Sequence, residues 1–250
     1  MIRKVYITMK ILSIGNSFSQ DAQRYLRAIA KHHGITVKAV NLYIGGCPLR
    51  RHYINMLEDR REYDFEFCGE KTGIKSSIKE ALISDEWDFV TLQQASPRSP
   101  DPDSYTPYIE ALADYVRKYC PKAKLLIHQT WAYEVGTDRL AALGYDDPRA
   151  MMADVRRAYR LAAEMIAADG VIPSGDAMEA ALELGIGSVH RDGFHASLGV
   201  GRYILALTWL KTLTDIDLEG ESFNELDAEM SDAERAIAIK AVEMAVLKKN

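Results

Sequence analysis

Short apolar runs alternate with amphipathic stretches along most of this chain. Several of the runs are apolar on both faces, which is typical of parallel strands covered by helices. They lie at residues 11–15, 36–44, 88–94, 123–129 and 170–175. Apolar residues recur with helical spacing at 21–33, 107–119, 149–168, 198–213 and 231–248. The alternation predicts an α/β protein, built as a three-layer α/β/α sandwich around a mostly parallel five-stranded sheet.

No low-complexity linker interrupts this alternation, so we expect a single domain over residues 1–250. Its core would run from about residue 10 to 213, and a C-terminal helix would follow at 231–248. The segment 61–70 fits neither pattern well and is either an extra strand or an ordered loop.

Composition narrows the class of protein. The net charge of −5 gives no basic surface for nucleic acid, and no apolar run approaches the 18 residues that indicate a membrane span. The chain has three cysteines, Cys47, Cys68 and Cys120, and so small and odd a number argues against a disulfide framework. With no recognisable signal peptide at the start, we expect a cytoplasmic protein, with a secreted form as the alternative if a leader was removed.

The predicted topology indicates where chemistry should occur. In parallel α/β sheets, ligands bind beyond the carboxyl ends of the strands. The loops at that edge are expected at residues 15–20, 45–50, 93–106, 129–148 and 174–177.

The first of these loops contains a candidate nucleophile. Ser17 follows the strand that ends at Gly15 and precedes the first helix. Taken alone, the segment from Asn16 to Ser19 is more simply explained as a polar turn that caps the helix. Ser17 becomes a nucleophile candidate only if a base lies at the same edge.

The segment near residue 190 contains a candidate base. Asp192 and His195 are three residues apart, so the carboxylate can reach Nδ1 of His195 and leave Nε2 free to act as a general base. A surface histidine capped by a nearby aspartate would show the same spacing. His190, Asp192 and His195 are also a candidate metal set, although no Glu or Cys cluster completes it.

Acyl transfer also requires hydrogen-bond donors for the oxyanion. Gly45 and Gly46 follow the second strand, where a glycine N–H can approach a substrate closely. Gln93 and Gln94 follow the third strand, and because neighbouring strand residues point to opposite sides, only one of the two should face the site. The spacing leaves both Gln93 and Gln94 open for this role.

Taken together, these segments resemble the SGNH (GDSL-type) hydrolases, in a divergent bacterial branch. Gly15-Asn16-Ser17-Phe18-Ser19 is similar to the first block of that family, with Asn in place of the usual Asp, and Asp192-Gly193-Phe194-His195 matches the last block. The third block departs, since the family has Gly-x-Asn-Asp where this chain has Gln93-Gln94-Ala95-Ser96. The resemblance covers residues 10 to about 213 and implies a flavodoxin-like α/β/α fold that needs no metal or cofactor.

The resemblance implies a serine esterase in which Ser17 is the nucleophile, His195 the base and Asp192 its partner. The oxyanion would be bound by the N–H groups of Ser17 and Gly46 and by the Gln94 amide. Aromatic rings at Tyr43, Trp131 and Tyr133 suggest stacking on a sugar, and hence removal of acetyl groups from a carbohydrate, although they could equally pack their loops. A non-catalytic carbohydrate or small-ligand binding domain is the alternative. A nucleotide-binding fold is disfavoured, because both glycine-rich phosphate motifs are missing.

Overall fold

The structure is a computed structural model that describes residues 8–247. Its centre is a sheet with the strand order β4-β3-β2-β1-β5-β6-β7. The parallel strands are β1 (Thr8–Gly15), β2 (Thr36–Tyr43), β5 (Phe89–Leu92), β6 (Lys124–His128) and β7 (Gly170–Ile172). β3 (Tyr63–Phe67) and β4 (Glu70–Ser76) add an antiparallel hairpin at the β2 edge. The predicted α/β class and the five predicted strands are therefore confirmed.

The count of five strands is wrong, because the sheet of residues 8–247 has seven. The uncertain segment 61–70 supplies β3 and the start of β4. β4 is exposed along nearly its whole length, so it carries no apolar run that would predict a strand.

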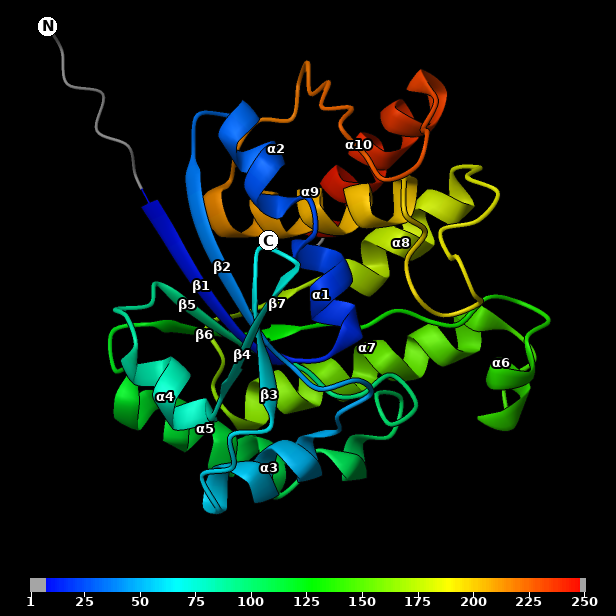
Figure 1. Cartoon of the computed structure of the whole chain (residues 1–250). Coiled ribbons are helices and arrows are strands. Elements are labelled where there is room, and N and C mark those ends of the chain that lie inside the picture. The colour runs from blue at the N-terminus through cyan, green and yellow to red at the C-terminus, as the bar shows by residue number, and fades with distance from the viewer. Residues whose placement is uncertain (1–7, 248–250) are drawn as a thin grey trace, which may run out of the picture.

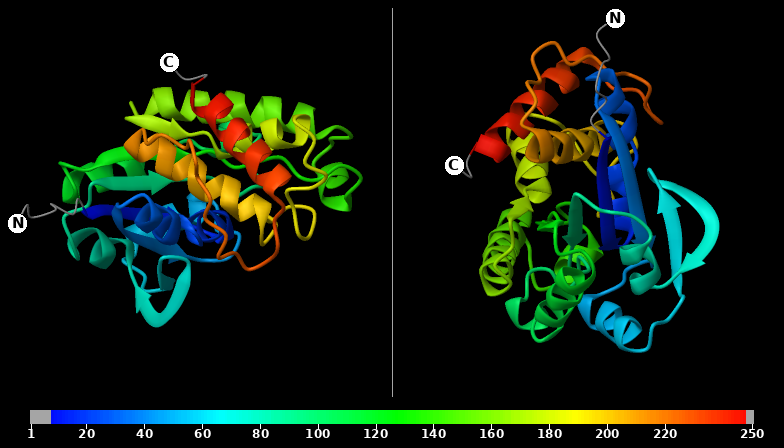
Figure 2. Two further views of the ribbon diagram at one scale, coloured as in Figure 1. Left: turned by 90° about the horizontal axis from the view of Figure 1, so that it is seen from above. Right: turned by 90° about the vertical axis from the view of Figure 1, so that its left-hand side faces the viewer.

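Helices cover both faces of the sheet. Figure 1 shows α1 (Ser17–Gln23), α2 (Leu26–His32), α8 (Ser174–Glu183), α9 (Val200–Thr214) and α10 (Asp232–Leu247) gathered on one side. On the other side lie α3 (Leu49–Leu57), α4 (Ile78–Ile83), α5 (Tyr108–Tyr119) and α7 (Pro148–Met165). The short α6 (Asp138–Ala142) and the 3-10 turn η1 (Pro102–Ser104) lie in the loops after β6 and β5. The views in Figure 2 show the same layers from above and from the side.

Several helix boundaries differ from the predictions. The predicted helix 21–33 is two helices, because the chain turns at Arg24–Tyr25, and the first of them begins at Ser17. The predicted loop 174–177 is the first turn of α8. The C-terminal helix is present as α10, while its predicted end at residue 248 lies outside the described residues.

The core lies on both faces of the sheet and includes the β1 residues Ile11, Leu12 and Ile14, all essentially inaccessible to solvent. Within residues 8–247, no helix combines the length and the apolar character that crossing a lipid bilayer requires.

Candidate active site

The turn between β1 and α1 presents Ser17 as the first residue of a helix. Asn16 caps this helix: its Oδ1 accepts a hydrogen bond from the Phe18 N–H (3.0 Å), and its own N–H donates to Ser19 Oγ (3.0 Å). Gly15 is required here, because a Cβ at that position would lie 2.1 Å from Ser19 Oγ. The polar residues do form a cap, as the simpler explanation predicts, and the same cap fixes the position of Ser17.

The structure brings Ser17 and His195 together, although they are 178 positions apart in the chain. His195 Nε2 lies 2.9 Å from Ser17 Oγ, and His195 Nδ1 lies 2.7 Å from Asp192 Oδ2. In a neutral ring whose Nδ1–H donates to a carboxylate, Nε2 carries no proton and accepts from the serine hydroxyl. The three side chains thus have the geometry that activation of a serine requires.

Asp192 is also held by the backbone of its own loop. Its Oδ1 accepts from the N–H groups of His195 (2.8 Å) and Phe194 (3.3 Å). Burial alone would raise the pKa of Asp192, but these bonds and the one from the His195 ring outweigh burial and hold the pKa below its usual value. Asp192 is therefore ionised beside His195 throughout the neutral range.

A buried ionic cluster ties the helix of Ser17 to the loop of His195. Asp21, one turn after Ser17 and fully buried, accepts from Arg191 Nη1 (3.0 Å to each oxygen) and from Arg202 Nε (2.9 Å). Its Oδ2 also accepts from the Ala196 N–H at 3.2 Å. We define Asp21, Arg191 and Arg202 as the Asp21 cluster. Sequence reasoning missed it, although an acidic residue on an otherwise apolar helix stripe is a usable signal.

The two glutamines after β5 point in different directions, as expected, but Gln94 is not the one beside Ser17. Its Oε1 accepts from the Leu49 N–H (3.0 Å), and its Nε2 donates to Ser104, at 3.0 Å to the carbonyl oxygen and 3.1 Å to Oγ. Gln93 lies next to the Ser17 turn, where its Nε2 donates to Asn16 Oδ1 at 2.7 Å. The contacts thus do not place Gln94, the expected oxyanion donor, beside Ser17; the glutamine that contacts the Ser17 turn is Gln93.

Gly46 lies in an exposed turn directly after β2. Its φ of +60° is the left-handed conformation that favours glycine, whereas a Cβ there would meet no atom within 4 Å. The next residue accepts a hydrogen bond from Asn16, whose Nδ2 lies 3.3 Å from the Cys47 carbonyl oxygen. Backbone conformation therefore explains the glycine, and the Asn16 contact joins its turn to that of Ser17.

The aromatic residues proposed to contact a sugar are largely buried. Trp131 is only 1% exposed, stacks on Phe18 with ring centroids 4.0 Å apart and donates to the Phe194 carbonyl oxygen at 2.8 Å. Tyr133 is also buried, and its hydroxyl pairs with Ser96 Oγ. Tyr43, at the end of β2, is half-buried, and Lys71 Nζ lies over its ring at 5.4 Å from the centroid. Trp131 thus supports the segments on both sides of the site and offers no open platform for a sugar.

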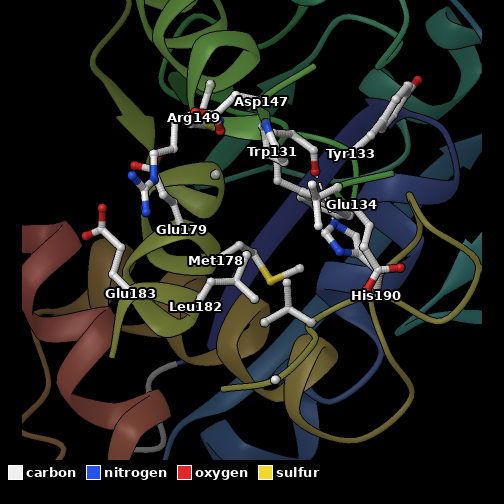
Figure 3. A pocket seen from close by; sticks show the side chains of 17 residues that line it. Trp131, Tyr133, Glu134, Asp147, Arg149, Met178, Glu179, Leu182, Glu183 and His190 are labelled. Carbon is white, nitrogen blue, oxygen red and sulfur yellow. Dashed lines mark hydrogen bonds between the residues drawn. The ribbon is translucent and has the colours of Figure 1, made fainter. Parts of the chain in front are cut away.

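A cavity of about 460 Å³ lies beyond Trp131, between the β6–α6 loop, α7 and α8. Figure 3 shows its apolar side chains Met178 and Leu182, with the charged Arg149 and Glu183 at one end. Neither Ser17 nor His195 lines this cavity.

His190 borders the same cavity and bonds to the backbone of the β6–α6 loop. Its Nε2 lies 3.0 Å from the Ala132 carbonyl oxygen, to which it donates, and burial lowers its pKa. In the described part of the chain, no three His, Cys, Asp or Glu side chains converge as a metal site requires. The geometry therefore does not favour His190, Asp192 and His195 as a metal set.

Two fully buried histidines, His52 and His128, should make the fold less stable in acid. Burial lowers the pKa of His52 and of His128 from the usual value to about 3. As the pH falls below the usual histidine pKa, the unfolded chain takes up these protons and the folded chain does not, so the free energy of unfolding falls. The expected loss is about 1.4 kcal/mol per histidine for each pH unit.

Urea denaturation between pH 6.5 and pH 4 measures this loss. His128→Phe should reduce the dependence of the unfolding free energy on pH by the contribution of about one proton. An unchanged dependence in that variant would contradict a neutral, buried His128.

Comparison with known proteins agrees with this fold. Among curated proteins, no match to this chain was found. A protein from Slackia heliotrinireducens proposed to be an SGNH hydrolase is 24% identical, with a TM-score of 0.61 over 82% of this chain and 99% of that one. An acetyl xylan esterase, AlAXEase, is 15% identical, with a TM-score of 0.56 over 82% of this chain and all of the other. The predicted resemblance to SGNH hydrolases is thus confirmed at the level of the fold.

The match to one family is far more extensive. A crystal structure of a DUF4886 family protein from Bacteroides uniformis is 33% identical, with a TM-score of 0.89 over 97% of this chain and 96% of that one. The family model described as Domain of unknown function (DUF4886) matches residues 10–243. This chain therefore belongs to the DUF4886 family and has the fold of the SGNH hydrolases.

Proposed function

We propose that this protein is a serine hydrolase that cleaves a small acyl ester. The observation that carries the proposal is the 2.9 Å contact between Ser17 Oγ and His195 Nε2, in a ring whose Nδ1 is bound to Asp192. A binding module would need no such alignment of a hydroxyl with a base. A hydrolase is therefore favoured over a non-catalytic carbohydrate-binding domain.

The reaction follows from this geometry. Ser17 Oγ attacks the ester carbonyl carbon while His195 Nε2 takes the hydroxyl proton. Asp192 holds the ring in the required tautomer and stabilises the imidazolium. The tetrahedral intermediate then expels the alcohol, which receives its proton from His195. Water, deprotonated by His195, attacks the acyl-serine, and the acid leaves as Ser17 regains its proton.

Three donors are proposed for the oxyanion: the backbone N–H groups of Ser17 and Gly46, and the side-chain amide of Gln93. Gln93 Nε2 carries two hydrogens, and one of them is used in the bond to Asn16 Oδ1. The other is available to a developing negative charge next to Ser17. In this proposal, Gln93 replaces the asparagine of the third SGNH block.

The two glutamines form a matched pair for testing the oxyanion donor. Gln93→Leu should lower kcat by roughly 10²–10³-fold with little change in KM, because a donor to the oxyanion acts mainly in the transition state. Gln94→Leu should lower the melting temperature, because it leaves the Leu49 N–H unpaired, but should preserve kcat. Steady-state kinetics on folded variants measures both. The reverse ranking of the two kcat values would return the role to Gln94.

The substrate class is proposed to be short-chain esters, with acetylated sugars as the first compounds to test. One protein of similar fold is an acetyl xylan esterase by name. Trp131, whose burial argues against a sugar platform, does not support this choice, whereas the half-buried Tyr43 is compatible with it.

Hydrolysis of acetylated sugars and of nitrophenyl esters with two, four and eight acyl carbons tests this choice. Acetyl and butyryl esters should give the highest kcat/KM. Preference for the eight-carbon acyl group would overturn the short-chain assignment.

A further inference from the structure

A buried histidine lies directly behind the proposed oxyanion donor. His128, the last residue of β6, has its Nδ1 2.8 Å from Gln93 Oε1 and its Nε2 3.0 Å from Ser174 Oγ. Ser174 is the first residue of α8, and none of the three side chains is more than 1% exposed. The chain of contacts continues through Gln93 to Asn16, the residue before Ser17.

The direction of each hydrogen bond in the series that links Phe18, Asn16, Gln93 and His128 follows from the Phe18 end. The Phe18 backbone N–H can only donate, so the Asn16 atom that faces it is Oδ1. The same oxygen faces Gln93, which must therefore present its amide nitrogen. Gln93 Oε1 then faces His128 Nδ1, which must carry a proton.

The contact at the other end of this hydrogen-bonded series, between His128 and Ser174, agrees with a proton on His128 Nδ1. A neutral imidazole has a single N–H, so a proton on Nδ1 leaves Nε2 as an acceptor, and Ser174 Oγ supplies the hydrogen. Burial lowers the pKa of His128 to about 3, so the ring is neutral in the neutral pH range. The ring also packs edge-on against Trp209, with centroids 4.8 Å apart, which restricts its rotation.

We propose that His128 is a positioning residue that, through its Nδ1–H, holds Oε1 of Gln93 and so acts together with Asn16 to keep the amide nitrogen of Gln93 toward Ser17. The catalytic consequence rests on the proposed hydrolase function, whereas the hydrogen-bond assignment does not. If the Gln93 amide were reversed, Oε1 would face Asn16 Oδ1 and the oxyanion, two acceptors that repel it. The His128–Gln93–Asn16 chain excludes that orientation before a substrate binds.

The hydrogen bonds from His128 through Gln93 to Asn16 also account for two departures from the SGNH pattern. Asn16 stands where the family has Asp, Gln93 replaces the family's Asn, and the two side chains touch at 2.7 Å. An aspartate at position 16 could accept from Gln93, but it could not donate to the Cys47 carbonyl oxygen as Asn16 Nδ2 does. The altered first and third blocks are therefore parts of one hydrogen-bonded unit.

Nitrogen-15 NMR of the histidine side chains tests the assignment in the unmodified protein. We expect His128 to show a protonated Nδ1 and an unprotonated Nε2, unchanged between pH 5.5 and pH 8. An Nε2–H tautomer, or titration within that range, would overturn the proposal. The spectrum does not depend on turnover, so this result is independent of whether the protein hydrolyses esters.

Kinetics then tests the positioning role. His128→Phe should lower kcat roughly 10–100-fold with KM nearly unchanged, because the donor loses one of its two orienting partners. In a Gln93→Leu background the same change should cause no further loss of kcat. An equal loss in both backgrounds, or full kcat in folded His128→Phe, would contradict the role; if that variant does not fold, the tautomer found by NMR decides.

Discussion

Replacing Ser17 with alanine should lower kcat for a short-chain ester by at least about 10⁴-fold, the scale on which serine hydrolases lose turnover without their nucleophile. The hydroxyl lies 2.9 Å from His195 Nε2, and no other side chain among residues 8–247 hydrogen-bonds to that nitrogen. The expected change in stability is small, because the cap of α1 uses the Asn16 and Ser19 side chains and not that of Ser17.

Circular dichroism should show the same fold for Ser17→Ala and the unmodified chain, and urea denaturation should show nearly the same free energy of unfolding. Ser84→Ala, at the exposed end of α4, is a matched serine control that should keep full activity. Turnover in Ser17→Ala within tenfold of the unmodified protein would remove Ser17 from the nucleophile role.

Replacing Asp21 with asparagine should lower the free energy of unfolding by about 3 kcal/mol, the lower end of the cost of breaking a buried ion pair. Asp21 is inaccessible to solvent and accepts from Arg191, Arg202 and the Ala196 N–H. An asparagine would aim its NH₂ at one of these donors and leave two guanidinium groups without a buried counter-charge. The partial exposure of both arginines keeps the loss near the lower end.

The same substitution should reduce kcat, because the Asp21 cluster joins α1, which carries Ser17, to the loop that carries Asp192 and His195. Asp227→Asn is the comparison variant: Asp227 also pairs with Arg202 and receives two hydrogen bonds from Arg24, but it is 28% exposed, so its loss should cost less than that of the buried Asp21. Urea denaturation and steady-state kinetics measure both effects. Equal losses for the two variants would contradict the role assigned to the Asp21 cluster.

The parallel core of the sheet is predictable from sequence because its strands are buried on both faces, as in β1 with Ile11, Leu12 and Ile14. β4 is not predictable in this way, since it is exposed and pairs only with β3. The break between α1 and α2 is hidden for a different reason: the apolar stripe continues across it, since Ala22 before the turn, Tyr25 within it and Leu26 after it are all buried.

The candidate site was predictable where spacing alone fixes geometry. Asp192 and His195 are three positions apart, and the carboxylate does reach Nδ1. Which of Gln93 and Gln94 lies beside Ser17 was not predictable, because it depends on how the chain leaves β5 after Leu92 and on partners at Leu49 and Ser104. The contacts of Asp21 and His128 join segments distant in sequence, which periodicity cannot reveal.

Labelling with a fluorophosphonate probe shows whether Ser17 is an activated nucleophile, since the probe requires a serine activated by a neighbouring base. Mass spectrometry of the digested protein should place the adduct on Ser17, and His195→Ala should abolish it. An adduct on another serine, or an unmodified Ser17 in an otherwise folded protein, would contradict the account.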